Sequence, residues 1–331
     1  MTRILVTGAA GFIGSAVAEK LIQQGNTVYA LDSYSNYYSQ NLKKARAERL
    51  KDIYGLKVRN VDLSDKKQVA KFLENHITDV VIHLAAQPGV RLPTSENHKY
   101  VRDNLVGFAN IANQSCIAEV KAFLYASSSS VYGNSDSEEL SENMLGIKPI
   151  SFYGATKLSN EVMANSLAFT SNTKFRGLRF FTVYGPWGRP DMAYLKIIDA
   201  AINKKSFQLF GDGSKARDFT YVTDVVESVI KLGDELLGRS PGMSDIVNIG
   251  GGHPVSMNTL IKTIENTLQT SITVTQGQNV LGDVTRTNAN TDYLKSLIEF
   301  GEFVGVQEGI ERTIEWAQEM EQRGNLRNWL K

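Results

Sequence analysis

Tyr153 and Lys157 stand four residues apart in the stretch Ser-Phe-Tyr-Gly-Ala-Thr-Lys, which is predicted to be helical. Residues at this spacing share one face of a helix. An ammonium beside a phenol favours the phenolate, because an opposite charge lowers the pKa of an acid. A free tyrosine titrates near pH ~10, so a tyrosine base that works near neutrality needs such help. Tyrosine and lysine are common on solvated helix faces, and the pair therefore gains meaning only from its neighbours.

A run of serines lies upstream of this pair, in Ala-Ser-Ser-Ser-Ser-Val-Tyr-Gly at residues 126–133. The run follows a predicted strand, so its hydroxyls are expected at the carboxyl edge of a sheet, where open α/β folds bind ligands. A serine at this edge can hydrogen-bond a substrate hydroxyl and help pass its proton to Tyr153. A serine run alone usually marks a loop, but together with Tyr-x-x-x-Lys it indicates proton-transfer chemistry.

A glycine-rich loop opens the chain. Gly8, Gly11 and Gly14 directly follow a predicted strand and begin a helix, which is the context required for dinucleotide binding. In such a loop the first glycine permits a tight turn, the second lets the backbone approach a pyrophosphate, and the third allows helix and strand to pack closely. The helix N-terminus attracts phosphates with unpaired N–H groups. We therefore expect this loop, including Phe12 and Ile13, to bind a dinucleotide.

Asp32 ends the next predicted strand, about twenty residues after the loop. A carboxylate there can accept hydrogen bonds from the adenosine ribose hydroxyls and would repel a 2′-phosphate, which favours NAD over NADP. Asp62 is either a contact on the adenine side, together with Leu63, or a plain turn residue. Small residues expected beside the cofactor follow the fourth predicted strand; they are Leu84, Ala85 and Ala86.

Short apolar runs alternate with helical patterns through the first 180 residues or so. Several runs are apolar throughout, as expected for parallel strands covered on both faces. The alternation predicts an α/β fold with a doubly wound parallel sheet of the Rossmann type. The predicted strands are Ile4–Val6, Thr27–Leu31, Lys57–Val61, Val80–Leu84, Ala122–Ala126 and Arg176–Phe180, and the predicted helices are Ser15–Gln24, Lys66–Asn75, Val101–Glu119 and Tyr153–Thr170.

The regular alternation stops after about Phe181, where Pro186, Gly188 and Pro190 interrupt it. Mixed short elements then predict a smaller mixed α/β domain that binds the substrate. We place the NAD-binding domain at residues 1–181 and the substrate-binding domain at residues 182–331, and we expect some segments of the second to return to the first.

Composition limits the class of protein and of partner. The 331 residues are 42% hydrophobic and 21% charged, with a net charge of +1. This balance gives no electrostatic reason to expect nucleic acid or an anionic membrane as partner, so a phosphate-bearing ligand requires a local site. A single cysteine, Cys116, cannot form an internal disulfide, which fits a reducing compartment. With no secretory or membrane-spanning segment predicted, we expect a cytoplasmic protein without a metal ion.

The ordered set of glycine loop, Asp32, Ser127–Gly133 and Tyr153-x-x-x-Lys157 resembles the extended short-chain dehydrogenase/reductase family, whose members act on nucleotide sugars. Within it, residues 85–91 (Ala-Ala-Gln-Pro-Gly-Val-Arg) and 180–193 (Phe-Phe-Thr-Val-Tyr-Gly-Pro-Trp-Gly-Arg-Pro-Asp-Met-Ala) are most similar to the UDP-glucuronate 4-epimerase subfamily. The resemblance implies that Ser128 is the catalytic hydroxyl and Tyr153 the acid/base. It also implies that Lys157 orients the nicotinamide ribose and lowers the pKa of Tyr153.

The residues around these positions indicate the substrate. Related dehydratases carry an Asp-Glu pair after the catalytic hydroxyl, and related decarboxylases carry a Glu, whereas this chain has Ser129 and Ser130. The position of a substrate-binding Asn in the galactose epimerases is Thr182. Arg189 can hold a hexuronate carboxylate bidentately, or it is a surface arginine of a Pro-rich loop.

By the same resemblance, Arg217 in Arg-Asp-Phe would clamp the nucleotide diphosphate. Asp283 in Gly-Asp-Val would contact the nucleotide, although Val280 and Leu281 depart from the family's pattern just before it.

The resemblance implies NAD-dependent epimerisation of UDP-glucuronate at C4, through a 4-keto intermediate and without net oxidation. Three alternatives remain open. They are a decarboxylase or net oxidoreductase of the same nucleotide sugar, a 4-epimerase of UDP-glucose or a UDP-N-acetylhexosamine, and a non-catalytic protein that senses NAD. The family also implies a homodimer through helices near residues 101–117 and 154–170.

Overall fold

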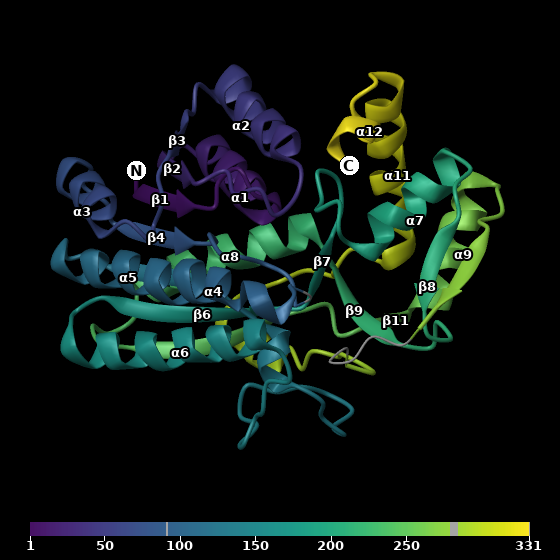
Figure 1. Ribbon diagram of the computed structural model, residues 1–331. Coiled ribbons are helices and arrows are strands. Elements are labelled where there is room, and N and C mark those ends of the chain that lie inside the picture. The colour runs from purple at the N-terminus through teal and green to yellow at the C-terminus, as the bar shows by residue number, and fades with distance from the viewer. Residues whose placement is uncertain (91, 279–283, 331) are drawn as a thin grey trace.

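The structure is a computed structural model that describes residues 1–90, 92–278 and 284–330. A sheet of seven parallel strands crosses the larger lobe in the order β10-β6-β5-β4-β1-β2-β3 (Figure 1). Its strands are β1 (Arg3–Thr7), β2 (Thr27–Asp32), β3 (Val58–Asn60), β4 (Val80–His83), β5 (Ala122–Ser128), β6 (Lys174–Phe180) and β10 (Ser244–Ile249).

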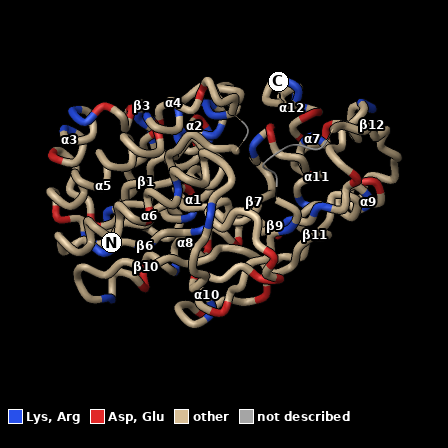
Figure 2. The backbone as a smooth tube through the Cα atoms, turned by 60° about the horizontal axis from the view of Figure 1, so that its bottom comes forward, with Lys and Arg blue, Asp and Glu red and all other residues tan. Residues whose placement is uncertain are grey.

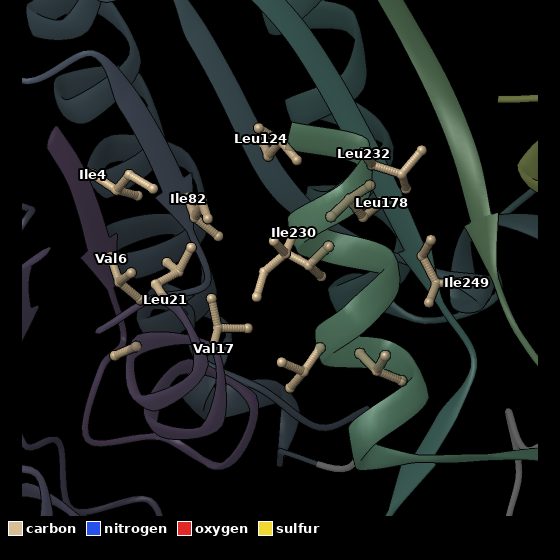
Figure 3. Packing of buried hydrophobic residues seen from close by; sticks show 14 of the residues in the cluster. Ile4, Val6, Val17, Leu21, Ile82, Leu124, Leu178, Ile230, Leu232 and Ile249 are labelled. Atoms are coloured by element: carbon tan, nitrogen blue, oxygen red, sulfur yellow. The ribbon is translucent and has the colours of Figure 1, made fainter. Parts of the chain in front are cut away.

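Helices cover both faces of this sheet, and the predicted doubly wound fold is confirmed. One face carries α1 (Phe12–Gln23), α2 (Gln40–Tyr54), α8 (Val222–Leu237) and α10 (Asp292–Leu297); the other carries α3 (Lys66–Asn75), α5 (Gly107–Ile117) and α6 (Phe152–Thr170). Figure 3 shows Val17 and Leu21 of α1, with Ile230 of α8, pointing into the layer beside the strands. Burial of these apolar faces provides the main stabilisation of the lobe.

The smaller lobe has a core of its own. Its strands are β7 (Thr182–Tyr184), β9 (Ala216–Tyr221) and β11 (Pro254–Ser256) in one sheet, and β8 (Phe207–Phe210) and β12 (Val274–Gly277) in another. Its helices are α7 (Ala193–Ile202), α9 (Met257–Leu268), α11 (Val306–Gln322) and α12 (Leu326–Trp329). The last of these packs beside α2 of the larger lobe (Figure 1).

The chain returns to the larger lobe after β9. Helix α8 packs against α1, and β10 extends the large sheet by pairing in parallel with β6. The sequence predicts the domain boundary at residue 181. Residues 222–249 come after this boundary in the chain, but they pack with the parallel sheet of the larger lobe. These residues therefore carry the chain from the smaller lobe back to the larger one.

Three local elements differ from the predicted helices. The sequence did not predict α2, because most of its residues are polar. The predicted helix 101–119 is instead α4 (Asn97–Tyr100), a π-helical turn η2 (Val101–Val106) and α5. The first helix begins at Phe12 rather than Ser15. Two 3₁₀ turns complete the description, η1 (Thr94–Glu96) and η3 (Ser129–Tyr132).

Charged residues of both signs are interspersed over both lobes (Figure 2), in keeping with the near-zero net charge. Across residues 1–90, 92–278 and 284–330, no helix has the length and apolar character needed to cross a membrane.

Candidate active site

The glycine loop joins β1 to α1 and forms one wall of a cavity of about 370 Å³. Gly8 adopts a positive φ of 72°, and a Cβ there would lie 2.7 Å from the backbone nitrogen of Ala85. A Cβ on Gly14 would lie 2.1 Å from the carbonyl oxygen of Gly8. Gly11 is the N-cap of α1 without a capping side chain, so the first N–H groups of the helix remain available to an anion. The loop therefore has the geometry of a pyrophosphate cradle.

Asp32 is fixed at the end of β2 and lines the same cavity. Its carboxylate accepts hydrogen bonds from the backbone nitrogens of Ala10 at 3.0 Å and Tyr34 at 2.7 Å. A small adjoining cavity of about 40 Å³ is lined by Asp32, Asp62 and Leu63. Asp62 also accepts hydrogen bonds from the backbone and hydroxyl of Ser64, at 2.9 and 2.8 Å. The position of Asp62 therefore fits both interpretations, a turn residue and a contact on the adenine side of the cofactor.

The serine run places its hydroxyls at the carboxyl end of β5, on the same cavity. The Ser128 hydroxyl accepts a hydrogen bond from the backbone nitrogen of Ser130 at 3.1 Å and lies 3.2 Å from the Ser130 hydroxyl. Tyr153 lies in the first turn of α6, which the Ser151 side chain caps at 3.0 Å. The predicted residues that line this cavity are Gly8, Gly11, Phe12, Ile13, Gly14, Asp32, Leu84, Ala85, Ala86, Ser128, Ser129, Ser130, Tyr153, Lys157, Thr182 and Arg189.

Lys157 is almost fully buried, with 1% of its surface exposed. Its ammonium donates a 2.8 Å hydrogen bond to the carbonyl oxygen of Ala126 and lies 5.7 Å from the ring centroid of Tyr153. Burial lowers the pKa of Lys157 to about 8, because desolvation disfavours the charged form. The lysine is therefore tied to the end of β5 rather than hydrogen-bonded to the phenol.

The pKa of Tyr153 depends on burial and on several neighbouring groups. Burial raises the pKa of Tyr153 above its ordinary value, and the opposing influences are the charge of Arg189 and a hydrogen bond with Ser128. The predicted effect of Lys157 on this pKa stays a prediction. The charge of Arg189 favours the Tyr153 phenolate, a role that the sequence analysis had not given to this residue.

A buried ion pair lies beside the serine run and is hydrogen-bonded to its first residue. Glu161 lies one helical turn after Lys157 and accepts hydrogen bonds from Arg179 at 2.9 and 2.8 Å. The same carboxylate accepts a 2.5 Å hydrogen bond from the hydroxyl of Ser127. Arg179 also lies 4.7 Å over the ring centroid of Tyr132. Helix α6, strand β6 and the residue before Ser128 are thus held by one network that the sequence did not reveal.

Arg189 is paired within its own loop. Its Nε donates to Asp191 at 3.0 Å and one Nη at 2.5 Å, a bidentate arrangement. Burial of Asp191 disfavours its charge, but the charge and hydrogen bonds of Arg189 outweigh burial and lower the pKa of Asp191. The remaining Nη1 of Arg189 donates no hydrogen bond to the described residues. The sequence shows that Asp191 stands two residues after Arg189, but it does not show that the Asp191 carboxylate pairs with the Arg189 guanidinium.

A second cavity of about 720 Å³ opens beside the first and lies mostly in the smaller lobe. Thr182 and Arg189 line both cavities. Arg217 lines the second cavity and donates hydrogen bonds to the carbonyl oxygens of Ala216 and Val284, at 2.8 and 2.6 Å. The charged side chains in its wall are Arg189, Asp191, Lys196, Asp199, Lys205, Lys215 and Arg217. With five cations and two carboxylates, this cavity suits an anion. Asp283 lies outside the described residues.

The sequence did not predict one residue of the cavity wall, Lys43, nor a buried polar residue behind that wall, Asn104. Lys43 of α2 lines the first cavity, and its ammonium donates to the carbonyl and hydroxyl of Ser35 at 2.8 and 2.9 Å. Asn104, 1% exposed in the π-helical turn η2, bonds the backbone of Gln87 at 2.8 and 3.2 Å and the hydroxyl of Thr156 at 3.1 Å. A π-turn is a frequent mark of a functional site, but only the backbone reveals it.

Comparison with known proteins identifies the family. Residues 4–250 match the model of the NAD dependent epimerase/dehydratase family. The chain belongs to this family. The resemblance inferred from the glycine loop, the serine run and Tyr153-x-x-x-Lys157 is thereby confirmed.

Several known proteins match almost the whole chain. Protein CapI of Staphylococcus aureus is 39% identical over 96% of this chain and 98% of its own length. A probable UDP-glucuronate 4-epimerase of Rhizobium meliloti is 37% identical over 98% and 99%. Among solved structures, UDP-glucuronic acid 4-epimerase from Bacillus cereus in complex with UDP-glucuronic acid and NAD has a TM-score of 0.89 at 30% identity, covering 96% of this chain and 100% of that one.

Proposed function

We propose that the protein is an NAD-dependent epimerase that interconverts UDP-glucuronate and UDP-galacturonate by inverting C4. The observation that carries this proposal is the joined pair of cavities, in which Ser128, Tyr153 and Lys157 face one side and a cationic wall faces the other. Thr182 and Arg189 lie where the two cavities meet. The relatives that bind or act on UDP-glucuronate support the choice of substrate.

The residues around the first cavity fit NAD. The glycine loop and the N-terminus of α1 would hold the pyrophosphate, Asp32 the adenosine ribose, and Lys157 the nicotinamide ribose. The tight approach of Gly8 to Ala85 leaves no room for a side chain in this wall. When bound, NAD supplies the acceptor for the C4 hydride of the sugar and returns the hydride to the opposite face.

Proton transfer belongs to the protein. Tyr153, as phenolate, takes the proton of the C4 hydroxyl while Ser128 hydrogen-bonds that hydroxyl, and it returns the proton after the sugar has turned. The high pKa of the buried phenol makes it a strong base once it is ionised. Arg189 and Ser128 both favour that ionised form. Because the hydride and the proton both come back, the reaction has no net redox change.

The uronate adds a hazard that the site has to control. A 4-ketone two carbons from the C6 carboxylate is a β-keto acid, which loses carbon dioxide readily. Arg189, with Thr182 and the hydroxyls of Ser129 and Ser130, would hold the carboxylate so that its bond to C5 stays out of line with the carbonyl π system. Arg217 and the neighbouring lysines would hold the diphosphate in the second cavity.

A substrate panel tests this proposal against its alternatives. The purified protein is incubated with UDP-glucuronate, UDP-glucose and UDP-N-acetylglucosamine in turn, and each product is identified by mass spectrometry and NMR. We expect UDP-galacturonate from the first sugar at the highest kcat/KM. Preference for a neutral sugar would support another 4-epimerase. Carbon dioxide release or net NADH would support a decarboxylase or oxidoreductase, and no turnover would support an NAD-sensing protein.

The protein is further proposed to work as a homodimer in a reducing compartment such as the cytoplasm, where its single cysteine stays reduced. Helices α5 and α6 pack side by side and expose Ile117, Val162 and Phe169, the last at 91%. Exposed apolar side chains on two neighbouring helices support a protein interface there. Phe169→Glu should convert a dimer to a monomer in analytical ultracentrifugation, whereas a monomeric wild-type protein would contradict the proposal.

A further inference from the structure

Arg46 is the most deeply buried cation of α2, with 2% of its surface exposed. No carboxylate pairs with it in the part of the chain that the structure describes. A buried charge without an ionic partner is costly unless hydrogen bonds satisfy it. All its recorded partners are neutral oxygens, and they come from three separate segments of the chain. Such an arrangement calls for an explanation beyond the stability of the helix.

The guanidinium of Arg46 joins the cofactor loop to the turn that carries Arg189. On one side, Nη1 donates to the carbonyl oxygen of Ala10, inside the glycine loop, at 3.2 Å. On the other side, Nε and Nη2 donate to the carbonyl oxygen of Trp187 at 3.1 and 2.6 Å, and Nη2 also donates to Gly188 at 2.9 Å. Arg189 is the next residue. A single side chain therefore connects the two walls of the site.

The turn before Arg189 adopts a backbone conformation that needs such support. Trp187 has a φ of +61°, in the left-handed region that bulky residues rarely adopt. Its indole packs against Trp316 and Trp329, with ring centroids 5.7 and 5.1 Å away. These are the three tryptophans of the chain. Arg46 therefore binds the carbonyl oxygens of this turn. The Trp187 side chain packs in the tryptophan cluster, defined as Trp187, Trp316 and Trp329.

We propose that Arg46 is a positioning residue that fixes Arg189 relative to the cofactor loop. The inference rests on the proposed function, because its consequence is expressed through the sugar carboxylate. With Arg46 in place, the Arg189 guanidinium is held in a fixed position relative to the cofactor loop, and it binds the sugar carboxylate there. Without it, the turn relaxes, the carboxylate is held less tightly, and more of the 4-keto intermediate loses carbon dioxide before the hydride returns.

The test is a double-mutant cycle with Arg46→Gln and Arg189→Ala. In the wild-type background, Arg46→Gln should lower kcat/KM for UDP-glucuronate roughly 10-fold to 100-fold, as expected for a misplaced binding group, and should raise the ratio of carbon dioxide to UDP-galacturonate. In the Arg189→Ala background, Arg46→Gln should change kcat/KM by about twofold or less, because residues that act through one another are not additive.

Arg176→Gln is the matched control. Arg176 is also fully buried, but it pairs with Glu235 of α8 and Asp245 of β10 and lines neither cavity. This variant should lose stability without changing the ratio of the two products. Without any nucleotide, tryptophan emission should shift to longer wavelength in Arg46→Gln, because the tryptophan cluster loosens, and should stay unchanged in Arg176→Gln.

Equal losses from Arg46→Gln in both backgrounds, or a product ratio that matches Arg176→Gln, would overturn the inference. If Arg46→Gln does not fold, Arg46→Lys serves instead, since an ammonium keeps the charge but not the fork that spans both walls. Failure of the wild-type protein to epimerise UDP-glucuronate would count against the proposed function. Epimerisation by the wild type with an additive cycle would count against the role of Arg46 alone.

Discussion

The ion pair between Arg189 and Asp191 predicts opposite effects for two substitutions in one loop. Asp191 occupies Nε and one Nη of the guanidinium, so a substrate carboxylate has to share Arg189 with it or displace it. Arg189→Ala removes the cation and leaves Asp191 uncompensated beside an anionic sugar. Asp191→Asn instead leaves Arg189 with its full charge and a weaker internal partner.

The expected magnitudes follow from the strength of such contacts. A hydrogen bond to a charged group contributes about 1.5–3 kcal/mol, which corresponds to roughly 10-fold to 150-fold in kcat/KM. We expect Arg189→Ala to lower kcat/KM for UDP-glucuronate by this factor. Asp191→Asn should lower KM for UDP-glucuronate severalfold, because less of the Arg189 charge is neutralised within the protein.

The assay compares UDP-glucuronate with UDP-glucose, which lacks the carboxylate. The ratio of kcat/KM for the two sugars should fall in Arg189→Ala and rise in Asp191→Asn, while the KM for UDP-glucose changes little in either. Carbon dioxide is collected in parallel, since a loosely held carboxylate should decarboxylate more often. An unchanged ratio in Arg189→Ala, or a ratio that falls in both variants, would refute the assignment of Arg189 to the uronate.

Three further substitutions test other parts of the site. Tyr153→Phe should lower kcat roughly 10²-fold to 10⁴-fold, the usual cost of losing a general acid/base, with unchanged unfolding by urea; near-normal turnover would exclude it as the base. Glu161→Gln breaks a buried pair and leaves the Arg179 charge uncompensated, so the free energy of unfolding should fall by about 3–5 kcal/mol; a loss below about 1 kcal/mol in urea titration would contradict the network. The pKa of Lys157, about 8 in the folded protein against 10.5 ordinarily, means that the unfolded chain binds more protons between these values. The contribution of Lys157 to stability should therefore rise with pH across that window. Relative to wild type, Lys157→Met should gain more stability at pH 8 than at pH 10, and an equal gain at both would show that the lysine titrates normally.

The sequence predicted the parts of the fold that depend on local patterns. The apolar runs of β1, β4 and β5 and the glycine loop follow directly from residue type and spacing, because buried parallel strands and phosphate cradles have strong local requirements. Pairings between distant segments could not be read in the same way. Strand β10 joins β6 across about 70 residues, and nothing local in Ser244–Ile249 shows which sheet it enters.

The candidate site likewise combines features that local sequence patterns predict with features that depend on contacts between distant segments. Tyr153 and Lys157 were recognised by type and spacing, Ser128 and Arg189 with the help of the family resemblance, and the structure brings all four to one cavity. Their electrostatic roles were not visible, because a pKa depends on burial and on neighbours from other elements. Lys157 donates a hydrogen bond to the carbonyl oxygen of Ala126, and the charge of Arg189 lowers the pKa of Tyr153. Lys43 and Arg46 lie in the polar helix α2 and were not predicted to be part of the site, because their burial arises only from tertiary contacts.

The central claim is that the C4 hydride leaves the sugar and returns to it within one active site. UDP-glucuronate carrying deuterium at C4 is incubated with the purified protein in ordinary water, without added NAD, and the product is analysed by mass spectrometry and NMR. The account predicts UDP-galacturonate that retains the deuterium at C4, with no NADH accumulating in solution. Loss of the deuterium to solvent, or NADH formed in proportion to product, would contradict it.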